Sequence, residues 1–496
     1  MEINDFEIVW LYVVDSGKWI KKKAEIKTIA ENLMEKLGSV EGIIRYFTPE
    51  ELGKGVDSTR KKAEIRVKNK KIKEVLDLYY ESDIDNIDPE YLENLQFFRA
   101  KMIGFEIELP NKRVEPIDVR LLFHNSGNFI LEFSLKLKNM AITPEIVNEI
   151  QLLPRTEDEL SLRVPQELFK DYSMINPESI ALVQKASKNK EKYVRINFTF
   201  HEIVWIYWAV VAYITMQEKI KNSKELYQAL RYNVFHFFPI LIFQFPEFAT
   251  IDDLLKEYKP ELFSMITQEI YLKPEFLRTD KMDETFDMQN NLSDRNDYAV
   301  YFCLESAMLL YSQKSRSAIE LIAKKRGISV ETQFTLEKLD LLLVLEFLHI
   351  QQFILMMYDF LLSRKSISEM DTDDLTYLRS LISKGIEEFH DIKLAIKTIT
   401  MDRLEKGRQC FKFDNSLSVL ESKLEIIDTA VQTIHNTLME FLNILLAILI
   451  TIAPMIAFSI GQNYEIAASF ITIGVLLGIY FLYKQLYKLW YRKQKF

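Results

Sequence analysis

The last eighty residues carry the pattern that most restricts how this chain can fold. Apolar side chains recur there at alternating spacings of three and four residues. They are Leu417, Leu420, Leu424, Ile427, Val431, Ile434 and Leu438. This alternation places one apolar stripe along a helix, as in the seam of a coiled coil. We therefore expect a coiled-coil stalk over residues 414–440 that associates with other copies of itself.

Two apolar segments follow the stalk, and a short polar link separates them. The first segment, residues 441–460, continues the stalk without a break, and the second covers residues 467–486. The link occupies residues 461–466. A helix rises about 1.5 Å per residue, so about 20 apolar residues are enough to cross the hydrocarbon core of a bilayer. The sequence therefore predicts two membrane-spanning helices.

The charges around these segments predict their orientation. The tail, residues 487–496, is rich in Lys and Arg, whereas the link carries neither. Short loops rich in Lys and Arg remain on the cytoplasmic side of a membrane. We therefore expect a multi-pass protein of the cell (inner) membrane, with its tail and its large N-terminal part in the cytoplasm and the link outside.

Charge, cysteine content and motifs narrow the class of protein. The net charge of −9 leaves no excess of cations to displace counterions from phosphates, which argues against a nucleic-acid partner. Two cysteines, Cys303 and Cys410, are too few for a disulfide framework and fit a reducing cytosol. The sequence contains no Gly-rich phosphate loop, no Cys-x-x-Cys and no His-Glu-x-x-His. We expect no enzymatic activity and assign no catalytic residue.

Residues 1–150 are expected to form an α+β lobe in the cytoplasm. The apolar run over residues 6–14 indicates a first buried strand. Apolar residues alternate along Val119–Lys138, on both sides of a turn at residues 125–128. This pattern predicts a β-hairpin, and therefore a sheet that is at least partly antiparallel.

Residues 151–297 are expected to form a second α+β lobe. The uncharged residues 203–216 are too few to span a bilayer and indicate a buried helix. Its aromatic side chains are interpreted as core rather than as a pocket for stacking bases. The apolar run of residues 234–245 predicts a buried strand, with an edge or bulge position at Pro239 because proline has no N–H to donate.

From Tyr298 onward the chain is expected to be helical, with a helical bundle over residues 298–413. Polar residues recur through the apolar stretch Leu336–Ser363, and they are too costly at membrane depth for a spanning segment. The fold class predicted for the whole chain is an α+β cytosolic domain followed by this bundle, the coiled-coil stalk and two C-terminal transmembrane helices.

The polar link adds a more specific signal. Gly461, Gln462 and Asn463 follow the first apolar segment directly, and Tyr464 and Glu465 lead into the second. In this setting of stalk, two spans and basic tail, the Gly-x-Asn sequence resembles the CorA family of divalent-cation channels, which carry Gly-Met-Asn at this place. The resemblance covers the last eighty residues, and it departs from the family pattern in having Gln462 in place of Met. The alternative is that the link is only a tight turn between two helices.

The resemblance implies a homopentamer in the lipid bilayer, with an ion pore on its axis. A selectivity filter is implied at Gly461, Gln462, Asn463 and Glu465. Asparagine carbonyl oxygens in a ring suit Mg²⁺ or another divalent cation that keeps its water shell. The residues expected to line the pore are Asn443, Leu445, Leu449, Thr451, Ile452, Ile456 and Ser459. A regulatory metal site between subunits is expected at Glu369, Asp371, Asp373 and Asp374.

Three functions are compatible with this pattern. The first is a divalent-cation channel or transporter, such as a magnesium transporter, gated from its cytosolic domain. Residues 1–413 are far more than a housekeeping transporter of this family carries before its stalk. A branch of the CorA family is found beside type III CRISPR systems, so the resemblance, together with this length, implies a second function. This is a membrane effector of an antiviral defence system that is activated by a small anionic nucleotide messenger of the SAM-AMP kind, for which no binding residues are assigned. The third is a non-conducting membrane anchor that displays an oligomeric binding module.

Overall fold

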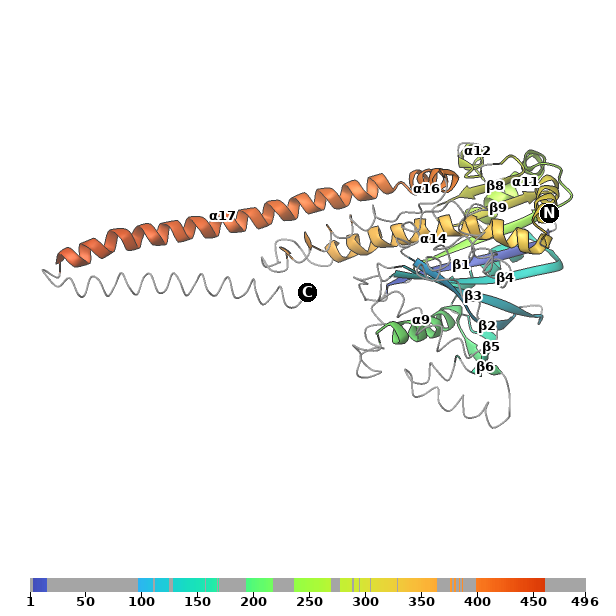
Figure 1. The fold of residues 1–496 in the computed structure, drawn as a ribbon, viewed down its shortest axis with the longest axis horizontal. Helices are drawn as coiled ribbons and strands as arrows, with labels where there is room; N and C mark the ends of the chain where they lie inside the picture. Colours follow the sequence, from blue (N-terminus) through green and yellow to red (C-terminus); the bar gives the residue numbers. More distant parts are fainter. Residues whose placement is uncertain are drawn as a thin grey trace, which may run out of the picture. The chain divides into compact units, whose positions relative to one another are not determined.

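The computed structural model describes two compact units of the chain (Figure 1). The first comprises residues 1–358 and 385–418, and the second comprises residues 359–384 and 419–496. The described residues are 3–15, 97–168 with short gaps, 193–216, 236–363 with short gaps, a few positions between 375 and 386, and 398–459.

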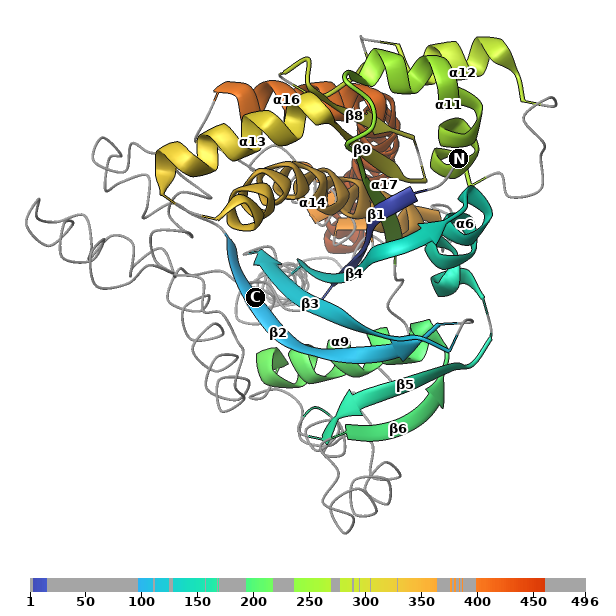
Figure 2. The same cartoon turned by 90° about the vertical axis from the view of Figure 1, so that its right-hand side faces the viewer.

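A mixed sheet of nine described strands is the centre of the first unit (Figures 1 and 2). The strands are β1 (Ile3–Asp15), β2 (Phe97–Glu108), β3 (Val114–His124), β4 (Asn128–Ile142), β5 (Leu160–Pro165), β6 (Tyr193–Phe198), β7 (His236–Phe245), β8 (Tyr298–Phe302) and β9 (Ala307–Ser312). Their order is β6-β5-β2-β3-β4-β1-β7-β9-β8. Neighbouring strands are antiparallel except for β7 and β9, which are parallel.

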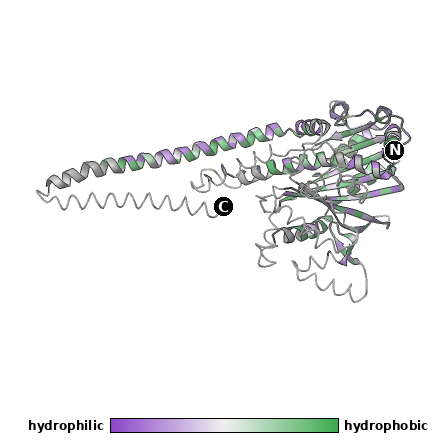
Figure 3. Ribbon diagram, in the orientation of Figure 1, coloured by the Kyte–Doolittle hydropathy of each residue, from purple (hydrophilic) through white to green (hydrophobic). Residues whose placement is uncertain are grey.

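Strand β1 lies inside this sheet, between β4 and β7. Its residues from Phe6 to Val14 are all buried, and Figure 3 shows hydrophobic residues concentrated along the central strands. A continuous apolar run is typical of a strand that is covered on both faces. The buried strand predicted over residues 6–14 is confirmed.

The hairpin predicted over Val119–Lys138 is also confirmed, as β3 and β4. Its pairing runs from Phe123 opposite Phe129 to Ile117 opposite Leu135. Alternate residues of β4 point to opposite faces of the sheet. One set, which includes Phe133, joins the large apolar core, and the other set includes the buried Glu132 and Ser134.

Helices cover both faces of the sheet (Figure 2). On the face of the large apolar core lie α6 (Pro144–Gln151), α9 (Phe200–Met216) and α11 (Ile251–Ile266), and α12 (Thr279–Thr285) packs on α11. On the opposite face lie α13 (Gln313–Arg326), α14 (Val330–Ser363) and α16 (Thr398–Cys410). The helix predicted over residues 203–216 is confirmed as α9, and the burial of Tyr207 and Trp208 confirms that these two aromatic residues belong to the core.

The strand predicted over residues 234–245 is confirmed as β7. Pro239 pairs with Trp10 of β1, whereas β9 pairs with β7 only from Ile240 onward. The proline therefore sits where β7 has a β1 neighbour but no β9 neighbour. An absent N–H is tolerated at such a position because no ladder bond is lost on the open side.

The sheet continues across the predicted boundary between the two lobes. Helix α6 crosses residue 150, and β5, from the second predicted lobe, pairs with β2 from the first. Strands β6, β7 and β8 follow in the same sheet. The edge of β2 that β3 leaves open pairs with β5, so the described strands of residues 1–150 and of residues 151–297 belong to one sheet.

The expectation of helix from Tyr298 onward is wrong for its first fifteen residues. Residues 298–302 and 307–312 form β8 and β9, and the first helix, α13, begins at Gln313. All six residues of β9 are buried. A short apolar run buried on both faces has no period that separates a strand from a buried helix, so the sequence pattern was not decisive there.

The helix α17 (Phe413–Ser459) is 47 residues long and corresponds to about 70 Å of helix. It contains the whole heptad pattern and continues into the first apolar segment. Two residues of the heptad seam, Leu420 and Ile427, are already buried in the single chain, whereas Val419 and Ile426 are 50% and 55% exposed. The seam is therefore not left free along its whole length for other copies of the chain.

Ion pairs join α17 to the rest of the second unit. Arg379 lies 2.6 Å from Asp428, and Lys423 forms a further pair with Asp359. Among the residues whose side chains are described, no helix is both long and apolar enough to cross a membrane. The side chains from Ile448 onward, and the second predicted span, lie outside the described residues.

Candidate functional site

A cavity of about 300 Å³ lies on the α14 face of the sheet. Its floor comes from β1, β4, β7 and β9, and its walls come from α13 and α14. The polar side chains that line it are Asp5, Glu7, Lys136, Lys138, Gln244, Tyr311, Ser312, Arg316, Glu331, Thr335 and Lys338. The sheet and two helices thus enclose a space that mixes charged and apolar walls.

Strand register explains why the polar groups gather here. Asp5 of β1 is opposite Lys138 of β4 on one side and Gln244 of β7 on the other, and Gln244 is opposite Tyr311 of β9. Residues opposite one another across a sheet project from the same face. These four side chains therefore form one row across the sheet. Glu7 and Lys136 begin the next row on that face.

Glu7 is the charged residue within the apolar run of β1, and it pairs with α14. Lys338 Nζ donates a hydrogen bond to Glu7 Oε1 at 2.6 Å. Ser134 Oγ donates to the same oxygen at 2.5 Å. The Lys338 side chain is 1% exposed, so this is a buried ion pair between residues that are 331 positions apart.

The surroundings of Glu7 act on its pKa in opposite directions. Burial raises the pKa, because it disfavours the charged carboxylate. The charges of Lys338 and Lys136 and the two hydrogen bonds outweigh burial, so the pKa of Glu7 is lower than usual. The carboxylate is therefore ionised at neutral pH and holds α14 against the sheet.

An aromatic wall closes the cavity on the β9 side. The ring centroids of Tyr311 and Phe334 are 4.9 Å apart in a T-shaped arrangement. Tyr311 is 3% exposed, and its hydroxyl has no hydrogen-bond partner within the described part of the chain. Burial raises the pKa of Tyr311 well above its usual value, so the hydroxyl keeps its proton and can donate a hydrogen bond.

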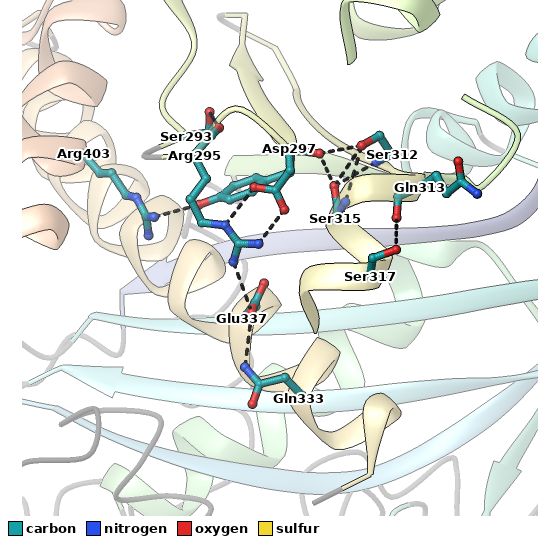
Figure 4. Close-up of polar contacts among 11 residues, drawn as sticks. Ser293, Arg295, Asp297, Ser312, Gln313, Ser315, Ser317, Gln333, Glu337 and Arg403 are labelled. Atoms are coloured by element: carbon teal, nitrogen blue, oxygen red, sulfur yellow. Dashed lines mark hydrogen bonds and ion pairs between the residues drawn. The ribbon is translucent and has the colours of Figure 1, made fainter. Parts of the chain in front are cut away.

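A polar network extends from this wall toward α14 (Figure 4). Arg295 Nε donates to Asp297 at 2.8 Å, and the same guanidinium lies 3.5 Å from Glu337 of α14. Gln333 also donates to Glu337, at 3.2 Å. This network fixes the segment before β8 against the first turns of α14.

Side-chain contacts connect the aromatic wall of the cavity to α16. Tyr298 is opposite Tyr311 in the β8–β9 ladder, and their rings stack with centroids 5.7 Å apart. Arg403 of α16 donates to the Tyr298 hydroxyl at 2.8 Å (Figure 4). The cavity wall is thus two contacts away from the helix that precedes α17.

Sequence reasoning did not identify this cavity. Its one local signal was Glu7, a carboxylate in an otherwise apolar strand. A charge at such a position needs a partner in the fold. The sequence does not show that this partner is Lys338.

The site residues predicted from the CorA resemblance lie largely outside the described residues. The filter residues Gly461, Gln462, Asn463 and Glu465 lie outside, as do Glu369, Asp371, Asp373 and Asp374. All the predicted pore residues fall within α17. Among them, only the side chain of Asn443 is described, and it is exposed. The described residues contain no group of three His, Cys, Asp or Glu side chains that could hold a metal ion.

Comparison of the chain with protein-family models, with curated proteins and with solved structures gives no match.

Proposed function

We propose that this chain forms a membrane channel for divalent cations that is controlled from its sheet-containing unit. The observation that carries the proposal is the unbroken helix α17, which begins at Phe413 beside α16 and extends to Ser459 in the first apolar segment. An uninterrupted helix of about 70 Å is a stiff connection between a folded domain and a membrane segment. The Gly-x-Asn sequence begins two residues after Ser459.

The continuity of α17 also supports the proposed pore. Leu424, Val431 and Leu438 recur every seven residues, and Leu445 and Ile452 continue the same period. Seven residues are close to two helical turns, so an unbroken helix keeps these side chains near one face. A stalk that associates through this face would place Leu445 and Ile452 toward the axis of the assembly, where an apolar constriction can gate by dewetting.

Ion flux tests the channel. The full chain in liposomes is expected to pass Mg²⁺, and Asn463→Ala is expected to lower the rate by about tenfold or more because the filter loses its carbonyl oxygens. Tyr464→Phe is the matched control in the same link and is expected to conduct like the parent. Light scattering in detergent measures assembly, which both variants should retain. Equal flux through the parent and Asn463→Ala would contradict the proposed filter.

A second candidate function, a ligand-activated membrane effector, is favoured by the charged cavity in the sheet-containing unit. Its wall is linked through Tyr311, Tyr298 and Arg403 to the helix that precedes α17. A ligand shifts a gate only if it binds the open and closed states with different affinities. Flux that appears only after a small anion is added would favour this function. An assembled chain without flux under either condition would leave the non-conducting anchor.

A further inference from the structure

The size of the cavity restricts what it can hold. Its volume of about 300 Å³ is at the lower end of the range typical of small-molecule sites, about 300–1,000 Å³. This space suits a compound with a single ring system, and it is too small for a dinucleotide. Its walls come from four strands and two helices, so regular secondary structure positions the lining residues.

The charges of the cavity favour an anion. Four cationic and three acidic side chains line it. Two of the acids have cationic partners inside the cavity, since Glu7 binds Lys338 and Glu331 lies 3.1 Å from Lys138. Asp5, the third acid, is opposite Lys138 in the β1–β4 register. The remaining cations are Lys136 and Arg316, whose pairs are with Asp118 and Glu320, acids that do not line the cavity.

The pair between Arg316 and Glu320 is exposed and easily exchanged. The Arg316 side chain is 56% exposed, and its Nε lies 3.4 Å from Glu320 one turn further along α13. Exposed ion pairs of this kind contribute little to stability. Arg316 can therefore turn from Glu320 to a ligand at small cost, and a guanidinium binds carboxylate or phosphate through two parallel hydrogen bonds.

The aromatic wall favours a ring. Tyr311 of β9 and Phe334 of α14 line the cavity. Aromatic side chains bind flat rings through stacked or edge-to-face contacts.

We propose that this cavity binds a small organic anion that carries one flat ring system, with the anionic group at Arg316 and Lys136 and the ring against Tyr311 and Phe334. The inference concerns binding and holds whether or not the chain conducts ions. Two sources share this chemistry, an aromatic carboxylate and a mononucleotide, and the test separates them.

Calorimetry on the full chain in detergent tests the proposal with six probes. Indole-3-acetate and adenosine 5′-monophosphate carry both a ring and a charge. Indole and adenosine carry the ring alone, and acetate and inorganic phosphate carry the charge alone. At least one ring-bearing anion is expected to bind with a Kd below about 1 mM, and about tenfold more tightly than its two halves. The better of the two anions identifies carboxylate or phosphate as the preferred group.

Variants locate the binding. Arg316→Gln is expected to weaken binding by about tenfold or more, because a charge-assisted hydrogen bond is lost. Phe334→Leu keeps an apolar side chain at the wall and removes the ring, so a loss of about three- to tenfold is expected. Lys324→Gln is the control, since it removes one positive charge from an exposed position of the same helix that does not line the cavity.

Three results would overturn the inference. One is the absence of binding by both ring-bearing anions at millimolar concentration, in a protein whose thermal unfolding shows that it is folded. Another is unchanged affinity in both Arg316→Gln and Phe334→Leu. The third is an equal loss in Lys324→Gln and Arg316→Gln, which would assign the binding to surface charge. Because no ion flux is measured, the failure of this inference is distinct from failure of the proposed channel.

Discussion

The two faces of the central sheet are buried in different ways. Toward α9, the side chains of β1 and β4 meet an aromatic cluster in which Phe200 contacts Trp10, Tyr12 and Phe133. Toward α14, the same strands present Glu7, Glu132 and Ser134, and ion pairs form under the helix. An apolar interface stabilises without regard to direction, whereas a buried ion pair requires one geometry. The first face therefore supplies stability, and the second fixes the position of α14 and leaves a polar cavity.

Truncating a side chain on the apolar face should lower the stability of the fold more than a change on the α14 face. Phe200→Ala removes a fully buried ring from the aromatic cluster, and the resulting cavity is expected to lower the free energy of unfolding by about 3–5 kcal/mol. Chemical denaturation at several pH values measures the loss, which should not vary with pH because no charge is involved. His201→Gln, at the next and exposed position of the same helix, is the control and should cost less than about 1 kcal/mol.

Replacing one member of the Glu7–Lys338 ion pair should lower the free energy of unfolding nearly as much as Phe200→Ala does. Replacing both members should leave it almost unchanged. Lys338→Met leaves the Glu7 carboxylate buried without its cation, which is expected to cost about 3–5 kcal/mol. The double variant Glu7→Leu with Lys338→Met removes both charges and should be within about 1 kcal/mol of the parent. A double variant as unstable as the single one would show that shape, rather than charge, holds α14 in place.

Acid should distinguish the two faces. The pKa of Glu7 is lower in the folded chain than its usual value of 4.5, so the folded state favours the ionised carboxylate. This stabilisation is fully present above pH 4.5 and is lost as the pH falls through the lowered pKa of the folded state. The parent should therefore lose more stability below pH 4.5 than the double variant, measured as the urea midpoint between pH 7 and pH 3. Equal acid sensitivity would assign the effect to other carboxylates.

The smallest effect is expected at the mouth of the cavity. Lys138 pairs with Glu331, whose side chain is 80% exposed, so Lys138→Gln should change the free energy of unfolding by less than about 0.5 kcal/mol. Thermal unfolding checks this, with Lys324→Gln as a control of equal charge. A loss above about 1 kcal/mol would mean that the rim is part of the structural ion network rather than free to meet a ligand.

The elements that the sequence predicted correctly have a strong local pattern. Strand β1 is a long apolar run, β3 and β4 alternate around a short turn, and α9 is uncharged over more than three helical turns. The N-terminus of α11 also depends on neighbouring residues, since Thr250 accepts a hydrogen bond from the backbone N–H of Asp253. In each case neighbouring residues contain the information, so no distant partner is needed.

The sequence by itself determined the apolar strands and helices and the heptad phase of α17, because spacing along the chain dictates which side chains share a face. Tertiary structure alone decided that residues 298–312 are strands rather than helix, that strands from both predicted lobes join one sheet, and that Glu7 meets Lys338. Each of these depends on backbone groups or charges that find partners far away in the chain. A contact between two distant residues lowers the free energy only after the chain between them has closed into a loop. The local propensities of the two residues therefore do not predict the contact.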